Sequence, residues 1–500
     1  MYSVPFGVGH LEFELLPGMR GTLVESKDVP PLASPASAIQ RALADPVGSA
    51  PLRDLAKPGD RVCLVFTDVT RACPDTLLVP PLLAELQSAG VRDEDITLLC
   101  GTGLHRPTTT AEKIGKLGLP VVNRYRVVDN AAQDEAAVVH LGATDPGVPV
   151  WVNRLVAEAD LVLATGVVEP HQYAGYSGGR KTVAVGAAGE ATIAYTHGIQ
   201  MADHPGARLG RVEGNPFHEA LSEAARRAGL RFILNVVLDD HERIIAVRAG
   251  EPIQTFLELV TAAREVYEAP VPQQYDVAVA GLGHPKDANL YQASRAASYL
   301  FLAPVPVVRR GGCIILPAPC PEGAGQGAGE RRFYDMMRSA PDAPSLLANL
   351  RRTGYPAGAQ RAFFLAQVLA ENSVIVVGAQ HPDLVRQLHM IPADTMMEAL
   401  HCAIRQIGRS DLDVLIVPRA LHTLPIVQFE PLHVAVGTVR LQMRRSGDDP
   451  QAVDAHDALR ILEALSRTEP ELAASRWYAS AQPHHLQQFL QMWESRSGGD

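Results

Sequence analysis

Short runs of β-branched and other apolar residues alternate with longer stretches of helical periodicity along most of the chain. This alternation is typical of parallel sheets covered by helices, so it predicts an α/β fold class with mainly parallel sheets. In the first half we expect strands at 61–67, 95–101, 160–166, 231–239 and 243–249. Between them we expect helices at 76–89, 110–118, 178–188 and 215–228, the last beginning at Asn215 and Pro216.

The pattern starts afresh near residue 271, where a proline-rich connector gives way to new strands and helices. Strands are expected here at 275–281, 311–318, 372–378 and 411–418, and helices from Asn289 and at 330–340, 356–371 and 393–407. We therefore predict two α/β domains, 1–270 and 271–430, with an active-site cleft between them. The alternation stops after about 430, so 431–500 is a C-terminal extension of unknown role with a helical stretch at 457–467.

Composition narrows the class of protein. The 500 residues exceed what one hydrophobic core normally serves, which favours two domains. A formal charge of −10 argues against a nucleic-acid binder, which would present a basic face. No apolar run approaches the roughly 18 residues of a membrane span, and the first residues do not resemble a secretory signal, so we expect a cytoplasmic protein. The six scattered cysteines are interpreted as small buried side chains.

Polar side chains follow three of the predicted strands, at the point where each strand ends. These residues are Asp68, Thr70 and Arg71 after the first strand, His105 and Arg106 after the second, and His171, Tyr176, Ser177, Arg180 and Lys181 after the third. In parallel sheets such ends share one edge, where ligands bind. Each signal alone has a structural alternative: Asp68 and Arg71 as a local ion pair, His105 as a hydrogen-bonded structural residue, and the glycines of GTG as turn residues.

Two further segments carry candidate chemistry. In SGGRK, two glycines open a helix beside Arg180 and Lys181, which is typical of a phosphate site. The alternative is a helix start chosen for packing, and the spacing of a P-loop is missing. Downstream, His197 and His204 are candidate metal ligands, although one or both can be structural. No zinc pattern is present, and imidazole also suits nickel.

The segments TDVTR, GTGLHRP, HQYAGYSGGRKT and THG resemble, in order and spacing, the nickel-dependent lactate racemase family, whose members are 2-hydroxyacid racemases and epimerases. The resemblance continues through EGNPFHEA at 213–220, DANLYQASR at 287–295 and IVPRALHTLP at 416–425. HQYAGYSGGRK is the most specific block of these.

The resemblance implies an isomerase that inverts C2 of a small 2-hydroxy acid by hydride transfer to and from a nickel-pincer nucleotide. That cofactor is pyridinium-3-thioamide-5-thiocarboxylic acid mononucleotide. It would be bonded to Lys181, with His197 as the protein ligand of nickel. Further cofactor contacts are expected from Asp68, Tyr176, Ser177, Gly178, Gly179 and Arg180. Cofactor-synthesis and nickel-insertion enzymes are the expected transient partners.

The resemblance also implies roles for the remaining site residues. His105 and His171 would serve as the two acid/bases, because histidine titrates near neutral pH. Arg71 would bind the substrate carboxylate, and Gln292 and Arg295 would contact the substrate from the second domain. Arg295 stands where lactate-using members carry a lysine, which suggests a larger or differently charged substrate. An aromatic residue expected within 355–363 is not a tryptophan here, and Tyr355 and Phe363 are the candidates to replace it.

Two alternatives remain open on the residues alone. Lys181 beside a phosphate site can instead form a Schiff base with a carbonyl compound. The chain can also be a catalytically silent nucleotide-binding protein of the same fold. A two-histidine arrangement argues against the second alternative, because a binding protein needs no pair of bases.

Overall fold

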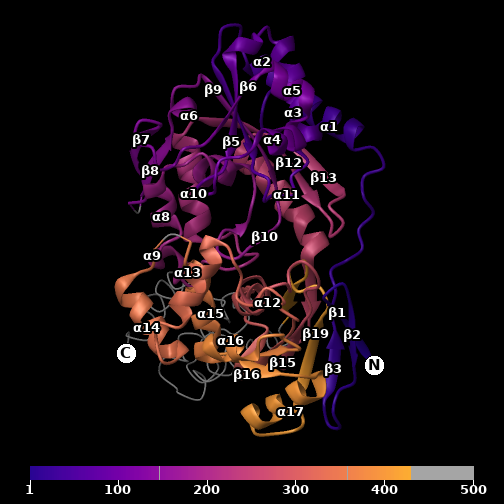
Figure 1. Ribbon diagram of the computed structural model, residues 1–500. Coiled ribbons are helices and arrows are strands. Elements are labelled where there is room, and N and C mark those ends of the chain that lie inside the picture. The colour runs from indigo at the N-terminus through magenta and orange to yellow at the C-terminus, as the bar shows by residue number, and fades with distance from the viewer. Residues whose placement is uncertain (146, 357, 429–500) are drawn as a thin grey trace, which may run out of the picture.

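The computed structural model describes residues 1–428 except 146 and 357. The predicted extension 431–500, with its helix at 457–467, lies outside the described residues. Figure 1 shows two lobes, each built around a six-stranded sheet with helices against it. The predicted α/β class with mainly parallel sheets is confirmed.

The first sheet has the strand order β13-β12-β9-β4-β5-β6 and is parallel except for β13, which runs antiparallel to β12. Its strands are β4 (Val62–Thr67), β5 (Ile96–Gly101), β6 (Arg126–Asp129), β9 (Leu161–Val167), β12 (Leu230–Leu238) and β13 (Ile244–Gly250). Every residue of β4 and β9 is buried, as expected for central strands covered on both faces. The five strands predicted in this half are confirmed, and β6 was not predicted.

The first lobe contains helices against this sheet and smaller elements at its margin. The helices are α1 (Pro35–Ala44), α2 (Leu52–Leu55), α3 (Asp75–Ser88), α4 (Thr110–Leu117), α5 (Leu119–Arg124), α10 (Pro216–Arg227) and α11 (Pro252–Tyr267). The smaller elements are the hairpin β7 (Val138–Ala143) and β8 (Pro149–Asn153) with α6 (Arg154–Ala157), α8 (Glu190–Thr196) and α9 (Ile199–Ala202). The Asn215 side chain caps α10 as the sequence predicts, by accepting from the N–H groups of Phe217 and His218.

The second sheet is parallel throughout, in the order β18-β17-β16-β15-β19-β3. Its strands are β15 (Tyr275–Ala280), β16 (Val308–Pro317), β17 (Ser373–Val377), β18 (Ile391–Ala393), β19 (Asp413–Val417) and β3 (Arg20–Leu23). The helices of this lobe are α12 (Leu290–Leu302), α13 (Ala328–Met337), α14 (Ala343–Thr353), α15 (Gln360–Glu371), α16 (Pro382–Gln387) and α17 (Met396–Ile407). Asn289 caps α12, where the sequence predicts a helix start.

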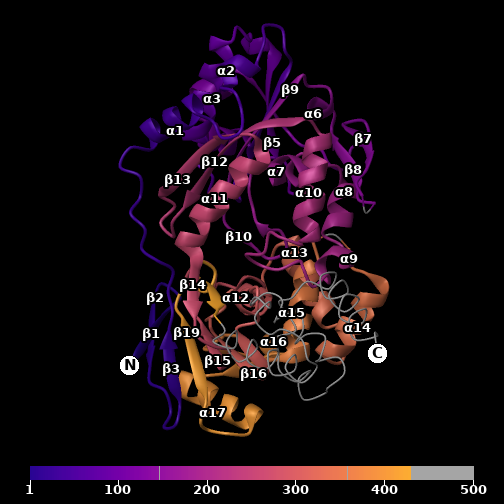
Figure 2. The same cartoon turned by 180° about the vertical axis from the view of Figure 1, so that it is seen from behind.

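The N-terminal residues belong with the second lobe. The hairpin β1 (Tyr2–Phe6) and β2 (Gly9–Phe13) lies there, and β3 pairs with β19. The chain then runs along the side of the molecule to α1 (Figure 2). β3 thus lies within the predicted first domain, 1–270, but completes the second sheet, whereas β1 and β2 form a separate two-stranded sheet. By pairing with β19, β3 covers an edge that would otherwise stay unpaired.

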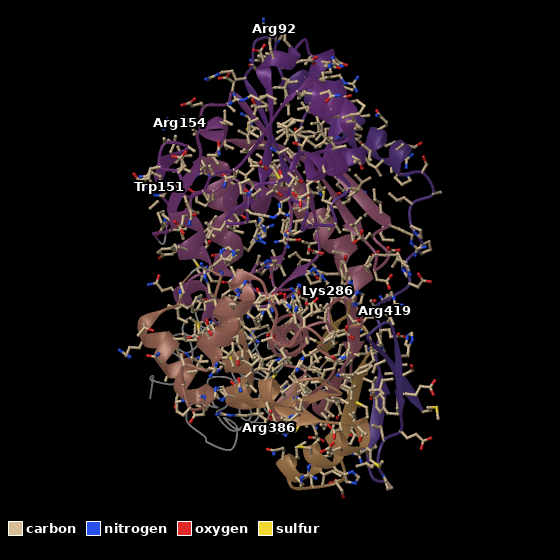
Figure 3. All side chains as sticks on the ribbon, viewed as in Figure 1. Arg92, Trp151, Arg154, Lys286, Arg386 and Arg419 are labelled. Atoms are coloured by element: carbon tan, nitrogen blue, oxygen red, sulfur yellow. The ribbon has the colours of Figure 1, made fainter. Side chains whose placement is uncertain are left out.

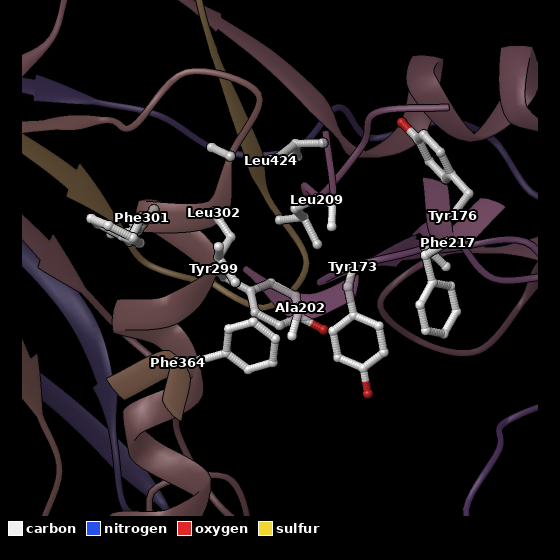
Figure 4. Packing of buried hydrophobic residues seen from close by; sticks show 14 of the residues in the cluster. Tyr173, Tyr176, Ala202, Leu209, Phe217, Tyr299, Phe301, Leu302, Phe364 and Leu424 are labelled. Atoms are coloured by element: carbon white, nitrogen blue, oxygen red, sulfur yellow. The ribbon is translucent and has the colours of Figure 1, made fainter. Parts of the chain in front are cut away.

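The two lobes are packed together at one side. In Figure 4, Tyr173 and Leu209 of the first lobe lie beside Tyr299, Leu302 and Phe364 of the second. The Tyr173 and Phe364 rings stack with centroids 5.5 Å apart, and the Leu209 N–H donates to the Leu302 carbonyl at 2.9 Å. The strands β14 (Glu268–Val271) and β20 (Leu424–Val427) pair in parallel at the junction. Within the described part of the chain, no helix combines the length and apolar character that a membrane crossing requires.

Candidate active site

A cavity of about 880 Å³ lies between the lobes at the carboxyl ends of β4, β5 and β9. This is where a ligand site is expected in an open parallel sheet, and the volume lies in the range of small-molecule sites. The second lobe contributes Tyr291, Arg332 and Gln360 to the wall. Eight of the predicted site residues line the cavity: Asp68, Arg71, His105, His171, Ser177, Gly178, Lys181 and His197.

Asp68 orients His105. The Asp68 Oδ2 atom lies 2.5 Å from His105 Nδ1, and Thr70 Oγ1 donates to Asp68 Oδ1 at 2.8 Å. The Asp68 side chain is 6% exposed and that of His105 is 53% exposed. Burial acts to raise the pKa of Asp68, but the hydrogen bonds from His105 and Thr70 outweigh it and lower the pKa. An ionised Asp68 therefore fixes a proton on His105 Nδ1 and leaves Nε2 as the free acceptor.

His171 and Lys181 are in direct contact. Lys181 Nζ lies 2.9 Å from His171 Nε2, and His171 Nδ1 accepts the Ala174 N–H at 3.2 Å. Because Nδ1 is an acceptor, the proton of a neutral His171 is on Nε2 and points to the lysine nitrogen. The lysine nitrogen can accept that proton only if it is a neutral amine.

The electrostatics of the cavity agree with two neutral groups. Burial, followed by the positive charge of Arg71, lowers the pKa of Lys181 well below its ordinary value. Burial, followed by the charges of Lys181 and Arg71, lowers the pKa of His171 well below its ordinary value. Both shifts favour the neutral forms, a lysine amine that is a nucleophile and an imidazole with a single proton.

The SGGRK segment opens a helix, as the sequence predicts for 178–188, but the helix is irregular. The short helix α7 (Gly179–Lys181) runs directly into a π-helix, η2 (Thr182–Gly186). Gly178 has φ +142°, and a Cβ atom there would lie 2.8 Å from the Phe256 ring. Ser177 Oγ donates to the Val167 carbonyl at 2.6 Å, which ties the turn to the end of β9. A π-helix is often found at functional sites, and this one follows Lys181.

Tyr176, Gly179 and Arg180 do not line the cavity, unlike their neighbours in the predicted cofactor set. The Tyr176 hydroxyl donates to Glu268 at 3.0 Å. The Arg180 side chain is fully buried, with its guanidinium carbon 3.7 Å from the centroid of the Phe256 ring and Nη2 donating to the Tyr176 carbonyl. Burial lowers the pKa of Arg180 to about 9. Of the two basic side chains of SGGRK, Lys181 therefore lines the cavity and Arg180 does not.

His197 presents one free nitrogen to the cavity. Its Nδ1 lies 3.1 Å from the Ile193 carbonyl, so Nδ1 is the donor and Nε2 is left as the ligand atom. Burial, followed by the charge of Lys181, lowers its pKa to about 3, so the imidazole is neutral. The Tyr355 hydroxyl donates to the His197 carbonyl at 2.9 Å. One of the two candidate aromatic residues therefore contacts His197, the predicted nickel ligand. Phe363 is fully buried.

Gln292 and Arg295 lie on α12 behind the cavity wall instead of in it. Arg295 Nη1 donates to Gln292 Oε1 at 3.4 Å, and Nη2 donates to the Tyr299 hydroxyl at 3.4 Å. Their neighbour Tyr291 is the α12 residue that does line the cavity. These two predicted substrate contacts thus bond to each other and do not line the cavity that His105 and His171 line.

Sequence reasoning missed Glu169 and Tyr173, which also line the cavity. Both lie in the stretch after β9 that supplies His171, so their position was the available signal. The Tyr173 ring contacts His171 and His197 edge-on, with centroids 4.7 and 5.2 Å apart. The weaker metal candidate, His204, accepts the Gly206 N–H instead of facing the cavity.

Among the described residues, one group of three has ligand atoms close enough for a metal ion: Asp239, Asp240 and His241. It lies between β12 and β13. Asp239 pairs with Arg243, and Asp240 pairs with Arg419, so the carboxylates already have partners. These three residues do not line the cavity, so they do not bear on its chemistry.

Comparisons with known proteins match both lobes. Residues 6–210 match the model of the lactate racemase N-terminal domain, and residues 272–424 match the lactate racemase C-terminal domain. The chain is 32% identical to a lactate racemase of Lactiplantibacillus plantarum over 388 residues, which cover 77% of this chain and 89% of that protein. It is 30% identical to a lactate racemase of Thermoanaerobacterium thermosaccharolyticum over 419 residues, 83% and 97% of the two chains.

Solved structures give the same result. The lactate racemase apoprotein from Thermoanaerobacterium thermosaccharolyticum superposes with a TM-score of 0.74 at 29% identity, covering 85% of this chain and 99% of that one. A protein from Thermotoga maritima has a TM-score of 0.54 at 20% identity, over 75% and 96% of the two chains, which shows the fold alone. From its sequence and both of its lobes, the chain belongs to the lactate racemase family and is an isomerase.

Proposed function

We propose that this protein is a racemase or epimerase that inverts C2 of a 2-hydroxy acid, using a nickel-pincer nucleotide bonded to Lys181. The observation that supports it most is the burial of the Lys181 amine, which lowers its pKa and favours its neutral form. This amine lies against His171 in the same cavity as His105 and His197. A neutral lysine amine is the form that can bond covalently to a cofactor.

The residues present fit the cofactor. Lys181 supplies the point of attachment, and His197 Nε2 is a free imidazole nitrogen, a ligand that suits a nickel ion. When bound, the group would supply a centre that takes up and returns the C2 hydrogen as hydride. A metal held by one protein ligand also needs the sulfur ligands that such a cofactor carries.

The two histidines then handle the proton of the substrate hydroxyl. His105 comes from the loop after β5 and His171 from the loop after β9, so they approach the cavity from different strand ends. Asp68 holds His105 through Nδ1, so Nε2 is the nitrogen that can exchange a proton with the substrate, and burial lowers the pKa of His171. A racemase needs one acid/base for each enantiomer, and two imidazoles from different loops meet that requirement.

Arg71 supplies the fixed positive charge for the substrate carboxylate. Its side chain lines the cavity, and no ion pair of its guanidinium is formed within the described ranges 1–145, 147–356 and 358–428. An arginine can bind a carboxylate through two parallel hydrogen bonds, which fixes the orientation of the neighbouring C2 carbon.

Intact-mass and nickel analysis tests the proposal. Protein co-produced with the cofactor-synthesis and nickel-insertion enzymes should gain the mass of a mononucleotide and bind nickel. A Lys181→Ala variant should gain neither, whereas Lys57→Ala, which changes an exposed lysine, should behave as wild type. The His105→Ala and His171→Ala variants should both lose racemisation of a panel of 2-hydroxy acids and keep nickel. Wild-type protein that stays unmodified under these conditions would contradict the proposal.

The neutral amine of Lys181 also favours a second candidate, a Schiff-base enzyme. In that case borohydride would trap a carbonyl adduct on Lys181 without nickel in the preparation. Trapping together with full activity in the absence of nickel would support this candidate and exclude the first.

A further inference from the structure

Two arginines of the second lobe lie side by side behind the cavity wall. Arg295 is on α12 and Arg361 on α15, and these helices pack against each other. The Arg361 guanidinium carbon lies 5.5 Å from the ring centroid of Tyr291, and Tyr291 lines the cavity. The residue before Arg361, Gln360, lines the cavity as well. Only one layer of side chains therefore separates the arginine pair from the cavity.

This pair lacks the acceptors that buried arginines need. Nε and Nη1 of Arg361 and Nε of Arg295 are buried without a hydrogen-bond partner. The remaining bonds of Arg295 are long, at 3.4 Å, and go to the neutral Gln292 and Tyr299. Arg208, another buried arginine near the junction, also has an unpartnered Nε, but its Nη1 donates to the carbonyls of Phe301 and Ala303. A buried cation without a partner is costly, so an unfilled pair of them indicates a missing anion.

The charges around the pair leave an excess of positive charge. The pKa of Lys286 is lowered mainly by burial and next by the positive charge of the nearby Arg295. His422 is also within reach of Arg295, with its pKa lowered mainly by burial. The Glu169 carboxylate of the first lobe, which lines the cavity, acts on both Arg295 and Lys286, and Glu242 also acts on Lys286. The buried guanidinium nitrogens of the pair still have no hydrogen-bond partner.

Arg361 and Arg71 are both near Tyr173, which lines the cavity. Their positive charges act on the Tyr173 hydroxyl, against the burial that raises its pKa to about 12. The Tyr173 ring in turn contacts His171 edge-on. Tyr173 therefore connects the surroundings of Arg361 with those of Arg71 and of the proposed acid/base.

We propose that Arg295 and Arg361 bind a second anionic group at the far end of the substrate, so that this enzyme acts on a 2-hydroxy acid with two anionic ends. The inference rests on the proposed function for its reaction and on the unpaired guanidinium groups for its specificity. A guanidinium pair can hold a terminal carboxylate through several hydrogen bonds, which a single lysine cannot do. The wall residue Tyr291 must then shift, or the lobes must close, when substrate binds.

The first test compares substrates through a ratio. The loaded enzyme should show a kcat/KM at least about tenfold higher for malate or 2-hydroxyglutarate than for lactate or 2-hydroxybutyrate, since one hydrogen bond to a charged group contributes that much. Arg361→Met and Arg295→Met should lower this ratio about 10- to 100-fold. Both substrates are measured on the same preparation, so a loss of active enzyme by partial unfolding lowers both kcat/KM values equally and leaves their ratio unchanged. Arg208→Met removes a buried arginine away from the cavity and should leave the ratio unchanged.

Other outcomes of this comparison are equally informative. A preference for 3-phosphoglycerate over malate, lost in Arg361→Met, would support the anion site with phosphate as its ligand. An equal loss on all substrates would mean that the arginines only partner Glu169, and it would overturn the inference. So would a wild-type preference for lactate.

The second test does not depend on the reaction. Isothermal titration calorimetry of the full chain made without the cofactor should show succinate, which has no hydroxyl group to react, binding more tightly than butyrate. Arg361→Met should remove this difference, and Arg208→Met should keep it. If succinate binds in this way but no 2-hydroxy acid is racemised by the loaded enzyme, the proposed function fails and the anion site stands. If racemisation occurs and succinate shows no advantage, the reverse holds.

Discussion

Lys116 and Asp75 form a buried ion pair beneath the loop that carries Asp68 and Arg71. Lys116 Nζ lies 2.8 Å from Asp75 Oδ2, and the two side chains are 11% and 0% exposed. Lys116 also donates to the carbonyls of Arg71 and Cys73 at 3.3 and 2.8 Å. The pair therefore joins α3 and α4 to the loop after β4.

We predict that Lys116→Met lowers the free energy of unfolding of the first lobe by about 3–5 kcal/mol, because the Asp75 charge is left buried without its partner. Asp75 still accepts from Thr67 Oγ1 and Thr165 Oγ1, at 2.7 and 2.5 Å, but two hydroxyl groups do not neutralise a carboxylate. For a lobe of this size the loss corresponds to a fall in Tm of roughly 6–20 °C. The loop would also lose its tether at the Arg71 carbonyl, so KM should rise.

Differential scanning calorimetry measures the loss directly. The double variant Lys116→Met with Asp75→Asn should recover much of the Tm, since a neutral amide no longer needs a cation and can accept from one threonine hydroxyl while donating to the other. Arg92→Ala, which breaks the exposed pair with Asp95, should change stability by less than about 1 kcal/mol. The reasoning fails if Lys116→Met shifts Tm no more than Arg92→Ala does, or if the double variant is no more stable than the single one.

Three further outcomes are expected. Asp68→Asn should lower kcat/KM about 10- to 100-fold, measured by a stereochemical assay, because it removes a charge-assisted hydrogen bond to His105; a change within twofold would contradict this. Lys181→Met should raise the Tm of the unmodified protein at pH 7, because burial lowers the pKa of this amine and keeps it neutral at a cost; a lower Tm would count against it. Burial lowers the pKa of His218 from 6.5 to about 3. Between pH 6.5 and 3 the unfolded chain therefore binds a proton at this histidine and the folded chain does not, so the free energy of unfolding falls as the pH falls through this range. His218→Gln should make the free energy of unfolding from urea titrations less dependent on pH, and an unchanged pH dependence would refute the assignment.

The sequence predicts the central strands well because their burial pattern is continuous. β4 and β9 are covered on both faces, so their residues are apolar without interruption, and the side chains that follow them must be polar. That physical constraint also brings Asp68, His105 and His171 together at one edge of the sheet. Strand-end position was therefore a sufficient signal for the core of the site.

Features that depend on distant pairing or on side-chain direction were not predictable in this way. β3 has four residues and gains its place from β19, nearly 400 positions later, so no local pattern marks it. Arg180 and Lys181 are consecutive in a helical turn and point about 100° apart, so only one of them can face the cavity. Arg361 has no motif around it, and its significance lies in nitrogen atoms left without acceptors, which only coordinates reveal.

In the proposed reaction, the positive charge of Arg71 would link substrate binding to the protonation of the site. It acts to lower the pKa of His171, Lys181 and His197, after burial in each case. A substrate carboxylate paired with Arg71 would cancel this charge, so the pKa of His171 would rise when the substrate binds. The proposed acid/base would then hold a proton more readily with the substrate present than in the empty cavity.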